Sequence, residues 1–462
     1  MKELIIIALL GIVVLAIDIL KLRKLTLPMT TLGLLVLIGV SIADWGTNQI
    51  PFAEYGGMLL FDNFALAFTI AFAFIALLWL LLTSDTYGNN HHKRTDIYAL
   101  SLFSLCGAVL MVSYSNLVML FLGLEILSIP LYALAASDKR NILSNEAGFK
   151  YFFLGSLASA VMLFGIALLY GACGSFDLAV IHEKILAMHH FGGLITTGVV
   201  LILAGFAFKI SVAPFHLWAP DVYQGSPTAV TAFMSTIVKG AAFGGMLRLF
   251  GTSLFPLPEY YGTALAWMSG LTLVLSNLIA LKQVNSKRLL AYSSVSHAGF
   301  MLGLIIMAST TSPKYLLYYI ITYSVASLTS FAVINHVSSI QNGDESIDAF
   351  KGLVKRNPLL AGAMTLSLFS MAGIPPLSGF LAKYFVISNL LSGGYIALVI
   401  IMILTSAIAA YYYLKIIIAM FTPLENAGRI YVDGLQKGLY IVLTILMVAF
   451  FFGAPVLEWV KW

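Results

Sequence analysis

Long runs of apolar residues constrain this chain more than any other feature. The stretch from Phe64 to Leu82 is one of many such runs, which recur from one end of the sequence to the other. A bilayer core about 30 Å thick needs about 20 apolar residues per helix, whereas a barrel strand needs only about 9–11. Because lipid offers the backbone no hydrogen-bond partners, only helices or closed barrels can span it. Runs of this length predict an all-α integral membrane protein.

Composition agrees with this prediction, because 60% of the residues are hydrophobic and only 10% are charged. A soluble domain carries about 25% charged residues. We expect fourteen membrane-spanning helices, the twelfth of them interrupted by Pro375-Pro376. They lie near 4–20, 28–43, 58–82, 96–112, 116–136, 148–171, 194–218, 226–250, 261–281, 288–308, 314–338, 357–390, 394–421 and 437–455.

The loop lysines and arginines gather in alternate loops, which predicts the orientation of the chain. One set of loops carries Lys21, Arg23, Lys24, Lys93, Arg94, Lys139, Arg140, Lys282, Lys287, Arg288, Lys351, Lys355, Arg356, Arg429 and Lys437. The other set, with the termini, carries only Lys2, Lys184, Lys314 and Lys461. Basic loops stay on the cytoplasmic side. We therefore expect both termini on the outer, periplasmic side of a bacterial inner membrane.

Four ionisable residues fall near the middle of predicted spans: Glu125, Lys209, Lys239 and Lys383. A charge at this depth costs at least about 2.5–3.5 kcal/mol, so such groups face the bundle interior and usually have a partner. We expect Glu125 to pair with Lys209. Burial favours the neutral form of each group and pairing favours the charged forms, so making or breaking the pair changes its proton affinity. A purely structural ion pair is the alternative.

Proline residues should break two of the spans close to buried lysines. Pro214 follows Lys209 by five residues, and the sequence Gly-Ile-Pro-Pro at 373–376 precedes Lys383. Proline removes a backbone donor and clashes with the preceding turn, so the first helix should break near Ala213. Interrupted helices in both halves of a transporter point to its ion site. The alternative is that these prolines are passive kinks.

Two histidines lie close to these features and could extend a proton path. His216 adjoins the first break, and His297 follows Ser293, Ser294 and Ser296 within one span. Histidine titrates near neutral pH, which suits a relay. Membrane histidines also serve as hydrogen-bonded packing residues, and this alternative stays open for both.

The sequence contains no recognisable cofactor motif. It has no glycine-rich nucleotide loop and no metal-ligand spacing, and Cys106 and Cys173 lie far apart in apolar surroundings. We therefore expect this chain to bind no nucleotide, metal or redox centre. Any energy from electron transfer must reach it from partner subunits.

Four segments of the chain carry a family resemblance. They are SNEAGFKYFFLGSLASAVMLFGIALLYG (144–171), PFHLWAPDVYQGSPTAVTAF (214–233), SKRLLAYSSVSHAGFM (286–301) and KRNPLLAGAMTLSLFSMAGIPPLSGFLAKY (355–384). They resemble the antiporter-like subunit N of bacterial NADH:quinone oxidoreductase (respiratory complex I), the counterpart of mitochondrial NADH dehydrogenase subunit 2. The resemblance runs from about residue 58 to 420. It implies fourteen helices with two inverted five-helix repeats, each containing a broken helix.

The resemblance also implies a division of the chain into four parts. Residues 1–95 would form three N-terminal helices, 96–255 the first repeat, 256–422 the second repeat, and 423–462 a C-terminal helix. By motif, Glu125, Lys209, Lys239 and Lys383 match the family's proton-translocating residues. Neighbouring membrane subunits and lipids would be the partners, with NADH, FMN, iron–sulfur clusters and quinone bound by other subunits.

Two other functions remain open at this point. The chain could belong to a multi-subunit cation/proton antiporter, a secondary transporter with no redox partner. It could also be a structural scaffold that ties helical partners together. Sodium-dependent proton exchange without NADH would favour the first, and unimpaired function after neutralisation of the buried charges would favour the second.

Overall fold

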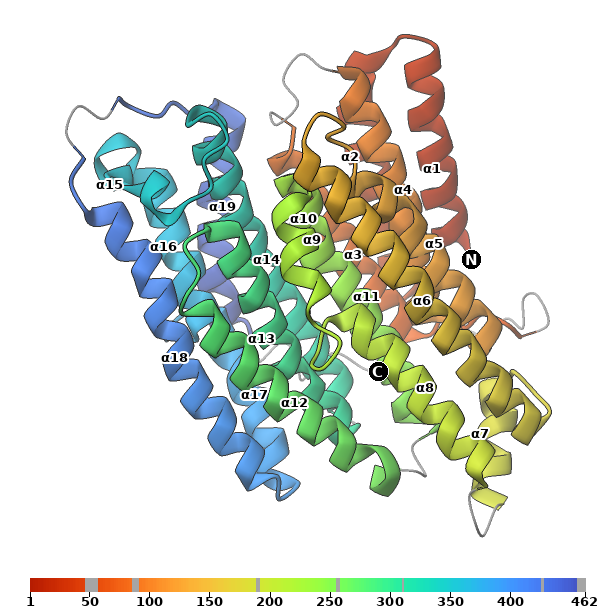
Figure 1. Cartoon of the computed structure of the whole chain (residues 1–462). Helices are drawn as coiled ribbons and strands as arrows, with labels where there is room; N and C mark the ends of the chain where they lie inside the picture. Colours follow the sequence, from red (N-terminus) through yellow and green to blue (C-terminus); the bar gives the residue numbers. More distant parts are fainter. Residues whose placement is uncertain are drawn as a thin grey trace.

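The computed structural model describes residues 1–45, 57–84, 91–187, 192–254, 258–309, 311–424 and 428–454, and it is a bundle of tilted helices (Figure 1). In chain order the helices are α1 (Lys2–Ile19), η1 (Arg23–Leu25), α2 (Thr26–Asp44), α3 (Asn63–Leu82), α4 (His91–Ser113), α5 (Leu117–Ala135), α6 (Ile142–Cys173), α7 (Leu178–Ala187), α8 (Gly193–Ile210), α9 (Trp218–Gly225), α10 (Thr228–Phe233), η2 (Met234–Val238), α11 (Lys239–Arg248), η3 (Leu249–Ser253), α12 (Pro258–Ala280), α13 (Ser286–Met307), α14 (Ser312–Ile340), η4 (Ile347–Phe350), α15 (Leu353–Arg356), α16 (Pro358–Ala372), α17 (Ser378–Ser392), α18 (Ile396–Phe421) and α19 (Gly434–Phe452).

Each of the fourteen predicted spans corresponds to one helix or to a series of consecutive helical segments, the longest series being α10, η2, α11 and η3 in the eighth span. In the described part of the chain, twelve helices are long and apolar enough to cross a membrane, and α16 is a shorter apolar helix. The first predicted span is α1, and the interrupted twelfth span is α16 followed by α17. The predicted fold class, an all-α membrane bundle with broken helices, is confirmed.

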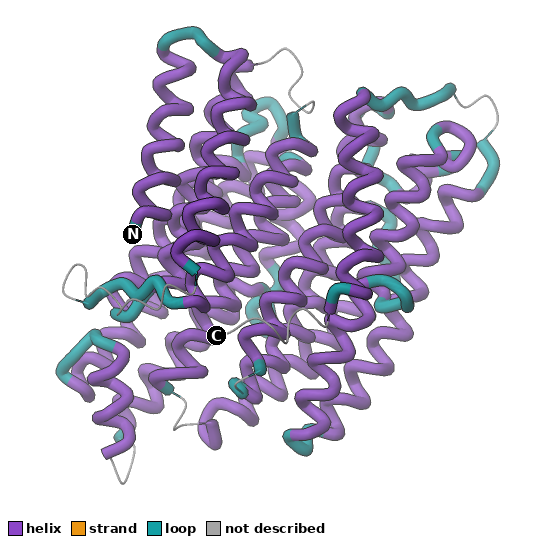
Figure 2. Tube along the Cα trace, turned by 180° about the vertical axis from the view of Figure 1, so that it is seen from behind, coloured by secondary structure: helices purple, strands orange, loops and turns teal. Residues whose placement is uncertain are grey.

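The connections between helices gather at the two ends of the bundle (Figure 2). The basic α1–α2 connection and α15 lie at one end, whereas α7 lies at the other (Figure 1). This placement agrees with the prediction that basic and non-basic loops alternate between the two ends. Which of the two ends faces the cytoplasm stays a prediction. One of the basic residues used for it, Lys461, lies outside the described residues.

The centre of the bundle is formed by three helical stretches enclosed by the others. The apolar windows of Thr228–Gly251 and Ser286–Met307 are 100% buried, and that of Ser312–Ile340 is 89% buried. The outer α2 and α19 are only 28% buried, as expected for helices that face lipid or partner subunits. Any polar residue on the central helices must therefore find its partner within the protein.

Asparagine and aspartate side chains fix where many of these helices begin. Asp62, Asn116, Asn141, Asn285 and Asn357 each stand just before a helix and accept a hydrogen bond from a backbone N–H of its first turn. The first N–H groups of a helix have no partner within the helix, and a cap of this kind contributes about 1 kcal/mol. The caps hold the helix ends where the apolar pattern stops.

Both predicted helix breaks are present. The helix α8 ends at Ile210, where Ser211 takes a left-handed conformation with φ 61°, and α9 begins at Trp218. The helix α16 ends at Ala372, where Gly373 has φ 88°, and α17 begins at Ser378. The first break therefore spans 211–217, around the predicted Ala213, and the second spans 373–377.

The second break is closed by a very tight approach of its two halves. A Cβ atom added at Gly379 would collide with the backbone oxygen of Ser370 and with that residue's carbonyl carbon. The Ser370 hydroxyl also accepts a hydrogen bond from the Gly379 N–H at 3.2 Å. Glycine at this position lets the start of α17 pack directly on the end of α16.

Replacing Gly379 with alanine should separate the two halves of the broken helix. We expect Gly379→Ala to lower the free energy of unfolding by about 1–3 kcal/mol, the usual cost of overpacking. Thermal unfolding of the detergent-solubilised protein measures it. The matched control is Gly362→Ala on α16, where the added Cβ meets nothing within 4 Å. Equal stability of the two variants would contradict the close approach.

Candidate functional site

Lys209 lies at the last turn of α8, immediately before the first break, and its side chain is buried. Its Nζ donates to Ser128 Oγ on α5 at 2.5 Å and to Tyr151 OH on α6 at 3.1 Å. The ammonium also lies 5.2 Å from the centre of the Tyr151 ring. Because an isolated ammonium is costly to bury, the two hydroxyl oxygens and the face of the Tyr151 ring stabilise the buried charge of Lys209.

The expected direct pair between Glu125 and Lys209 does not form in this structure. Within the described residues, Lys209 directs its bonds to Ser128 and Tyr151, and Glu125 Oε1 is buried without a hydrogen-bond partner. The reason is the spacing on α5. Ser128 lies one helical turn beyond Glu125 and presents its hydroxyl to the ammonium in place of the carboxylate.

Lys239 opens α11, directly after the single π-helical turn η2, and lies at the buried centre of the bundle. Its Nζ donates to both the backbone oxygen and the hydroxyl of Ser294 on α13, each at 2.6 Å. The Tyr223 ring lies 6.0 Å from the same nitrogen. Single π turns of this kind are frequent at functional sites.

His297 lies about one helical turn beyond Ser293 and Ser294 on α13, and each of its two ring nitrogens has a tyrosine hydroxyl as its partner. Nδ1 lies 2.8 Å from Tyr319 OH, and Nε2 lies 3.4 Å from Tyr413 OH. Tyr413 OH also shares a hydrogen bond with Ser293 Oγ. Of the hydroxyls that precede His297 in the sequence, that of Ser293 therefore leads to it, through a tyrosine that the sequence analysis did not single out.

Lys383 lies on α17 and turns back to the end of α16. Its Nζ donates to the backbone oxygen of Ala372 at 3.0 Å and lies 3.5 Å from Ser406 Oγ, with the Phe300 ring 5.0 Å away. Ala372 is the last residue of α16. Carbonyls at the end of a helix have no partner within the helix and carry partial negative charge, so the break itself supplies a ligand for the cation.

His216 lies inside the first break and is buried, but both its ring nitrogens lack a hydrogen-bond partner in the described structure. It is therefore near Lys209 in sequence without being bonded into the same group of side chains. The structure brings His297 into a hydrogen-bonded group and leaves His216 outside it.

Aromatic rings and a small cavity lie between the three lysine sites. Tyr151 stacks on Trp218 with ring centres 4.8 Å apart, and Trp218 meets Tyr223 edge-on at 6.2 Å. These rings lead from the Lys209 site to the Lys239 site. On the other side, a small cavity lined by His297, Tyr319, Ser370, Gly379 and Ala382 reaches the residue next to Lys383. Together these groups form a central polar chain, by which we mean the Lys209, Lys239, His297 and Lys383 sites with their partners.

The described residues offer no obvious place for a metal ion, because nowhere among them do three His, Cys, Asp or Glu side chains gather. Cys106 and Cys173 are not joined to each other or to another cysteine. The chemistry that the central polar chain can support is the binding and release of protons by amines, an imidazole and hydroxyls.

Comparisons with known proteins identify the family of the chain. The family profile described as "NADH:quinone oxidoreductase/Mrp antiporter, TM" matches residues 114–409. NADH-quinone oxidoreductase subunit N of Flavobacterium johnsoniae is 44% identical over 436 residues, which cover 93% of this chain and 93% of that protein. The subunit N of Cytophaga hutchinsonii is 42% identical over 425 residues, which cover 92% and 91%.

A solved structure shares the fold along nearly the whole chain. A chain of respiratory complex I from Thermus thermophilus with bound aureothin superposes with a TM-score of 0.84 at 32% identity. The match covers 99% of this chain and 98% of that one.

The partners of the central polar chain lead to a prediction about stability. Ser294→Ala removes a hydroxyl acceptor from the buried Lys239 ammonium, which should cost about 1–3 kcal/mol. Ser324→Ala is the matched control, because Ser324 is equally buried and its hydroxyl has no hydrogen-bond partner. Thermal unfolding of both purified variants should show a lower midpoint for Ser294→Ala alone. Equal midpoints would mean that the Ser294 hydroxyl does not stabilise the cation.

Proposed function

The chain belongs to the NADH:quinone oxidoreductase/Mrp antiporter transmembrane family, and on that premise we propose that it is a membrane-arm subunit that translocates protons. The observation that carries the proposal is the row of three buried lysines, each held by oxygen atoms, with Lys209 and Lys383 next to the two helix breaks. Ionisable groups at membrane depth are functional by default. A lysine amine that exchanges one oxygen partner for another can take up and release a proton.

The proposed path runs along the central polar chain. Lys209 passes a proton past the aromatic rings to Lys239, whose partner Ser294 adjoins the group around His297. From there the proton reaches Lys383, at the second break. Glu125 lies one helical turn from Ser128, and its negative charge acts on the Lys209 ammonium. When the hydrogen bond between Lys209 and Ser128 breaks, Glu125 pairs with Lys209 directly.

Energy for this movement would come from quinone reduction in partner subunits. The relatives at 44% and 42% identity are named NADH-quinone oxidoreductase subunit N, which supports assembly with other subunits. In this proposal, lipids cover the surface that those subunits leave free. In this proposal NADH, FMN, iron–sulfur clusters and quinone are bound by those partners and none is bound by this chain. The chain is then part of a translocase without holding a redox centre.

The proposal includes an orientation and an internal repeat. The basic loops face the cytoplasm and both termini face outward in a bacterial inner membrane. Residues 96–255 and 256–422 are the two antiporter-like repeats, with 1–95 and 423–462 as flanking helices. One break falls in each repeat, and the path of the proton crosses from the first repeat to the second.

A cation/proton antiporter remains the second candidate. A chain of the Mrp complex from Dietzia sp. superposes with a TM-score of 0.87, covering 99% of this chain and 95% of that one, but at 19% identity the likeness concerns the fold alone. No contact in the described residues favours sodium over a proton. Sodium-driven proton exchange in vesicles that lack NADH would support this second candidate.

The proposal predicts the effect of removing the central lysines. Lys209→Ala and Lys239→Ala should slow proton transfer through this chain by about 100-fold or more, the usual contribution of a positioned acid–base group. The measurement is NADH-driven proton uptake into inverted vesicles, recorded with quinone reduction after assembly is verified on a native gel. Lys415→Ala is the control, because among the described residues its Nζ donates only to the backbone oxygen of Gln283, in the connection between α12 and α13.

Two results would change the conclusion. Normal proton uptake in assembled Lys209→Ala and Lys239→Ala complexes would exclude the pump and support a scaffold. Loss of uptake in Lys415→Ala to the same extent would mean that any change of lysine disturbs the complex. Glu125→Ala, tested in the same way, separates a coupling role for the carboxylate from a role in packing.

A further inference from the structure

The helix α12 lies at the outside of the bundle but turns a polar face inward. Its apolar window is only 44% buried, and Trp267 on the outer side is 77% exposed. Ser269, Thr272, Ser276 and Asn277, by contrast, are all fully buried. Because they are spaced by three, four and one residues, they share one face of the helix. Buried polar residues in membrane helices are costly and tend to serve function, yet the proton path proposed above uses none of these four.

Thr272 holds the first helix break by a hydrogen bond to its backbone. The N–H of Ala213, inside the break at 211–217, donates to Thr272 Oγ1 at 2.8 Å. The Thr272 hydroxyl in turn donates to the backbone oxygen of Met268 at 2.5 Å, so its oxygen is left as an acceptor for the break. Ala213 and Thr272 are both fully buried. Because a buried backbone N–H without a partner is costly, the break depends on this hydroxyl.

Among the described residues, Thr272 is the only one on another helix that forms a hydrogen bond with the break. The other hydrogen bonds of the break stay within the broken span itself. The Val212 N–H bonds back to the Ala207 oxygen on α8 at 3.0 Å. Trp218, the first residue of α9, donates its indole N–H to the Phe208 oxygen on α8, also at 3.0 Å. A shift of the break is therefore transmitted through hydrogen bonds to α12 first.

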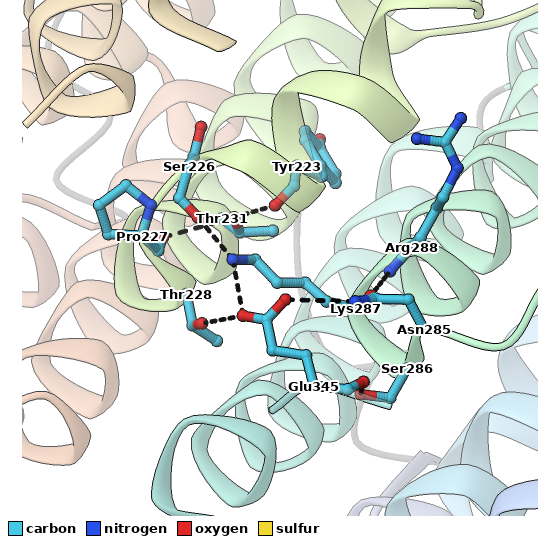
Figure 3. Close-up of polar contacts among 10 residues, drawn as sticks. All are labelled: Tyr223, Ser226, Pro227, Thr228, Thr231, Asn285, Ser286, Lys287, Arg288 and Glu345. Atoms are coloured by element: carbon cyan, nitrogen blue, oxygen red, sulfur yellow. Dashed lines mark hydrogen bonds and ion pairs between the residues drawn. The ribbon is translucent and has the colours of Figure 1, made fainter. Parts of the chain in front are cut away.

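Beyond the break, the far end of the broken span is fixed to the start of α13. Lys287 Nζ donates to the backbone oxygen of Ser226, directly after α9, at 2.5 Å (Figure 3). The same nitrogen pairs with Glu345 Oε1 at 3.1 Å, which holds the lysine in place. Arg288 Nη1 donates to Asp221 Oδ1 on α9 at 2.8 Å. The half-helix α9 is thus tied to α13, whereas the break that precedes it is tied to α12.

Asn277, about 7.5 Å further along α12, binds the two helices that hold His297 and its partner Tyr413. Its Nδ2 donates to Ser296 Oγ on α13 at 2.8 Å, and its Oδ1 accepts from Tyr412 OH on α18 at 3.1 Å. Ser296 directly precedes His297, and Tyr412 directly precedes Tyr413. One buried amide therefore sets how the backbone around His297 lies relative to the backbone around Tyr413.

We propose that α12 links the first helix break to the group around His297, with Thr272 and Asn277 as its two positioning residues. The proposal rests on the proposed function of this chain in proton translocation. It adds the physical connection by which a rearrangement at the first break, next to Lys209, reaches the second repeat. Neither residue carries a proton in this proposal, and each acts through the groups that it holds.

The contacts explain how a shift would travel along this helix. When the break moves, its buried N–H keeps a partner only if α12 moves with it. Because α12 is one uninterrupted helix from Pro258 to Ala280, Asn277 then moves together with Thr272. The contact between Tyr413 OH and His297 Nε2, at 3.4 Å, is at the long end for a hydrogen bond. A small displacement passed on by Asn277 therefore decides whether this bond is made.

Amide hydrogen exchange tests the hold of Thr272 on the break. Thr272→Val keeps the shape of the side chain but removes the acceptor, whereas Thr272→Ser keeps the acceptor. In the assembled complex, we expect Thr272→Val to speed exchange in the peptide that contains Ala213 by about 10-fold, with Thr272→Ser at the wild-type rate. Ser276→Ala is the matched control, because its hydroxyl donates only to its own helix, to the oxygens of Thr272 and Leu273. Unchanged exchange in Thr272→Val would overturn the link.

The number of protons taken up per NADH oxidised, measured in inverted vesicles, tests the consequence for function. We expect Thr272→Val and Asn277→Leu to lower this ratio toward the value of Lys209→Ala, while quinone reduction continues. The double variant should be no lower than either single one, because both changes cut the same link. Thr272→Ser and Ser276→Ala should keep the wild-type ratio. A role in stability alone would reduce the amount of assembled complex and leave the ratio unchanged.

The outcomes separate this link from the proposed function. A normal ratio in Thr272→Val and Asn277→Leu, with a lowered ratio in Lys209→Ala, would overturn the link and leave the proposed function standing. An equal loss in Ser276→Ala would also overturn the link, because any change on this face of α12 would then have the same effect. A normal ratio in Lys209→Ala would overturn both. If Asn277→Leu does not assemble, the Thr272 variants decide the question.

Discussion

A cation buried where water is excluded must be given its oxygen partners by the protein itself, and the rest of this structure depends on that constraint. Lys209 meets hydroxyls from α5 and α6, Lys239 meets one serine of α13, and Lys383 meets the end of α16. None of these partners lies on the same unbroken helix as its lysine. The Lys209 and Lys239 contacts tie together helices that are far apart in the sequence, and the Lys383 contact ties together the two halves of a broken helix.

The two helix breaks serve this constraint in different ways. At the second break, the terminal carbonyl of α16 is itself the ligand of Lys383. At the first break, Lys209 stands on the last turn of α8 and takes its partners from elsewhere, while the break turns Trp218 onto the Tyr151 ring. One interruption thus provides an acceptor, and the other positions an aromatic bridge. Similar sequence signals have produced different local chemistry.

The number and place of the spans could be predicted from the sequence, because the length of an apolar run is set by the thickness of the membrane. Both breaks and the burial of the three lysines followed from proline geometry and from their central position. The partner of Lys209 could not be predicted, since a carboxylate and a serine one turn apart on α5 compete for the same ammonium. Tyr319 and Tyr413 were missed because a tyrosine within an apolar run carries no sign of which way its hydroxyl points.

The π-helical turn just before Lys239 has a consequence for how that lysine is aimed. A π turn holds one residue more than an α turn, and each residue of an α-helix rotates the following side chain by about 100°. The direction of the Lys239 amine is therefore set by the winding of residues 234–238 as much as by the lysine itself. A change from π to α winding in this one turn would rotate the Lys239 amine away from Ser294 without moving the axes of the neighbouring helices.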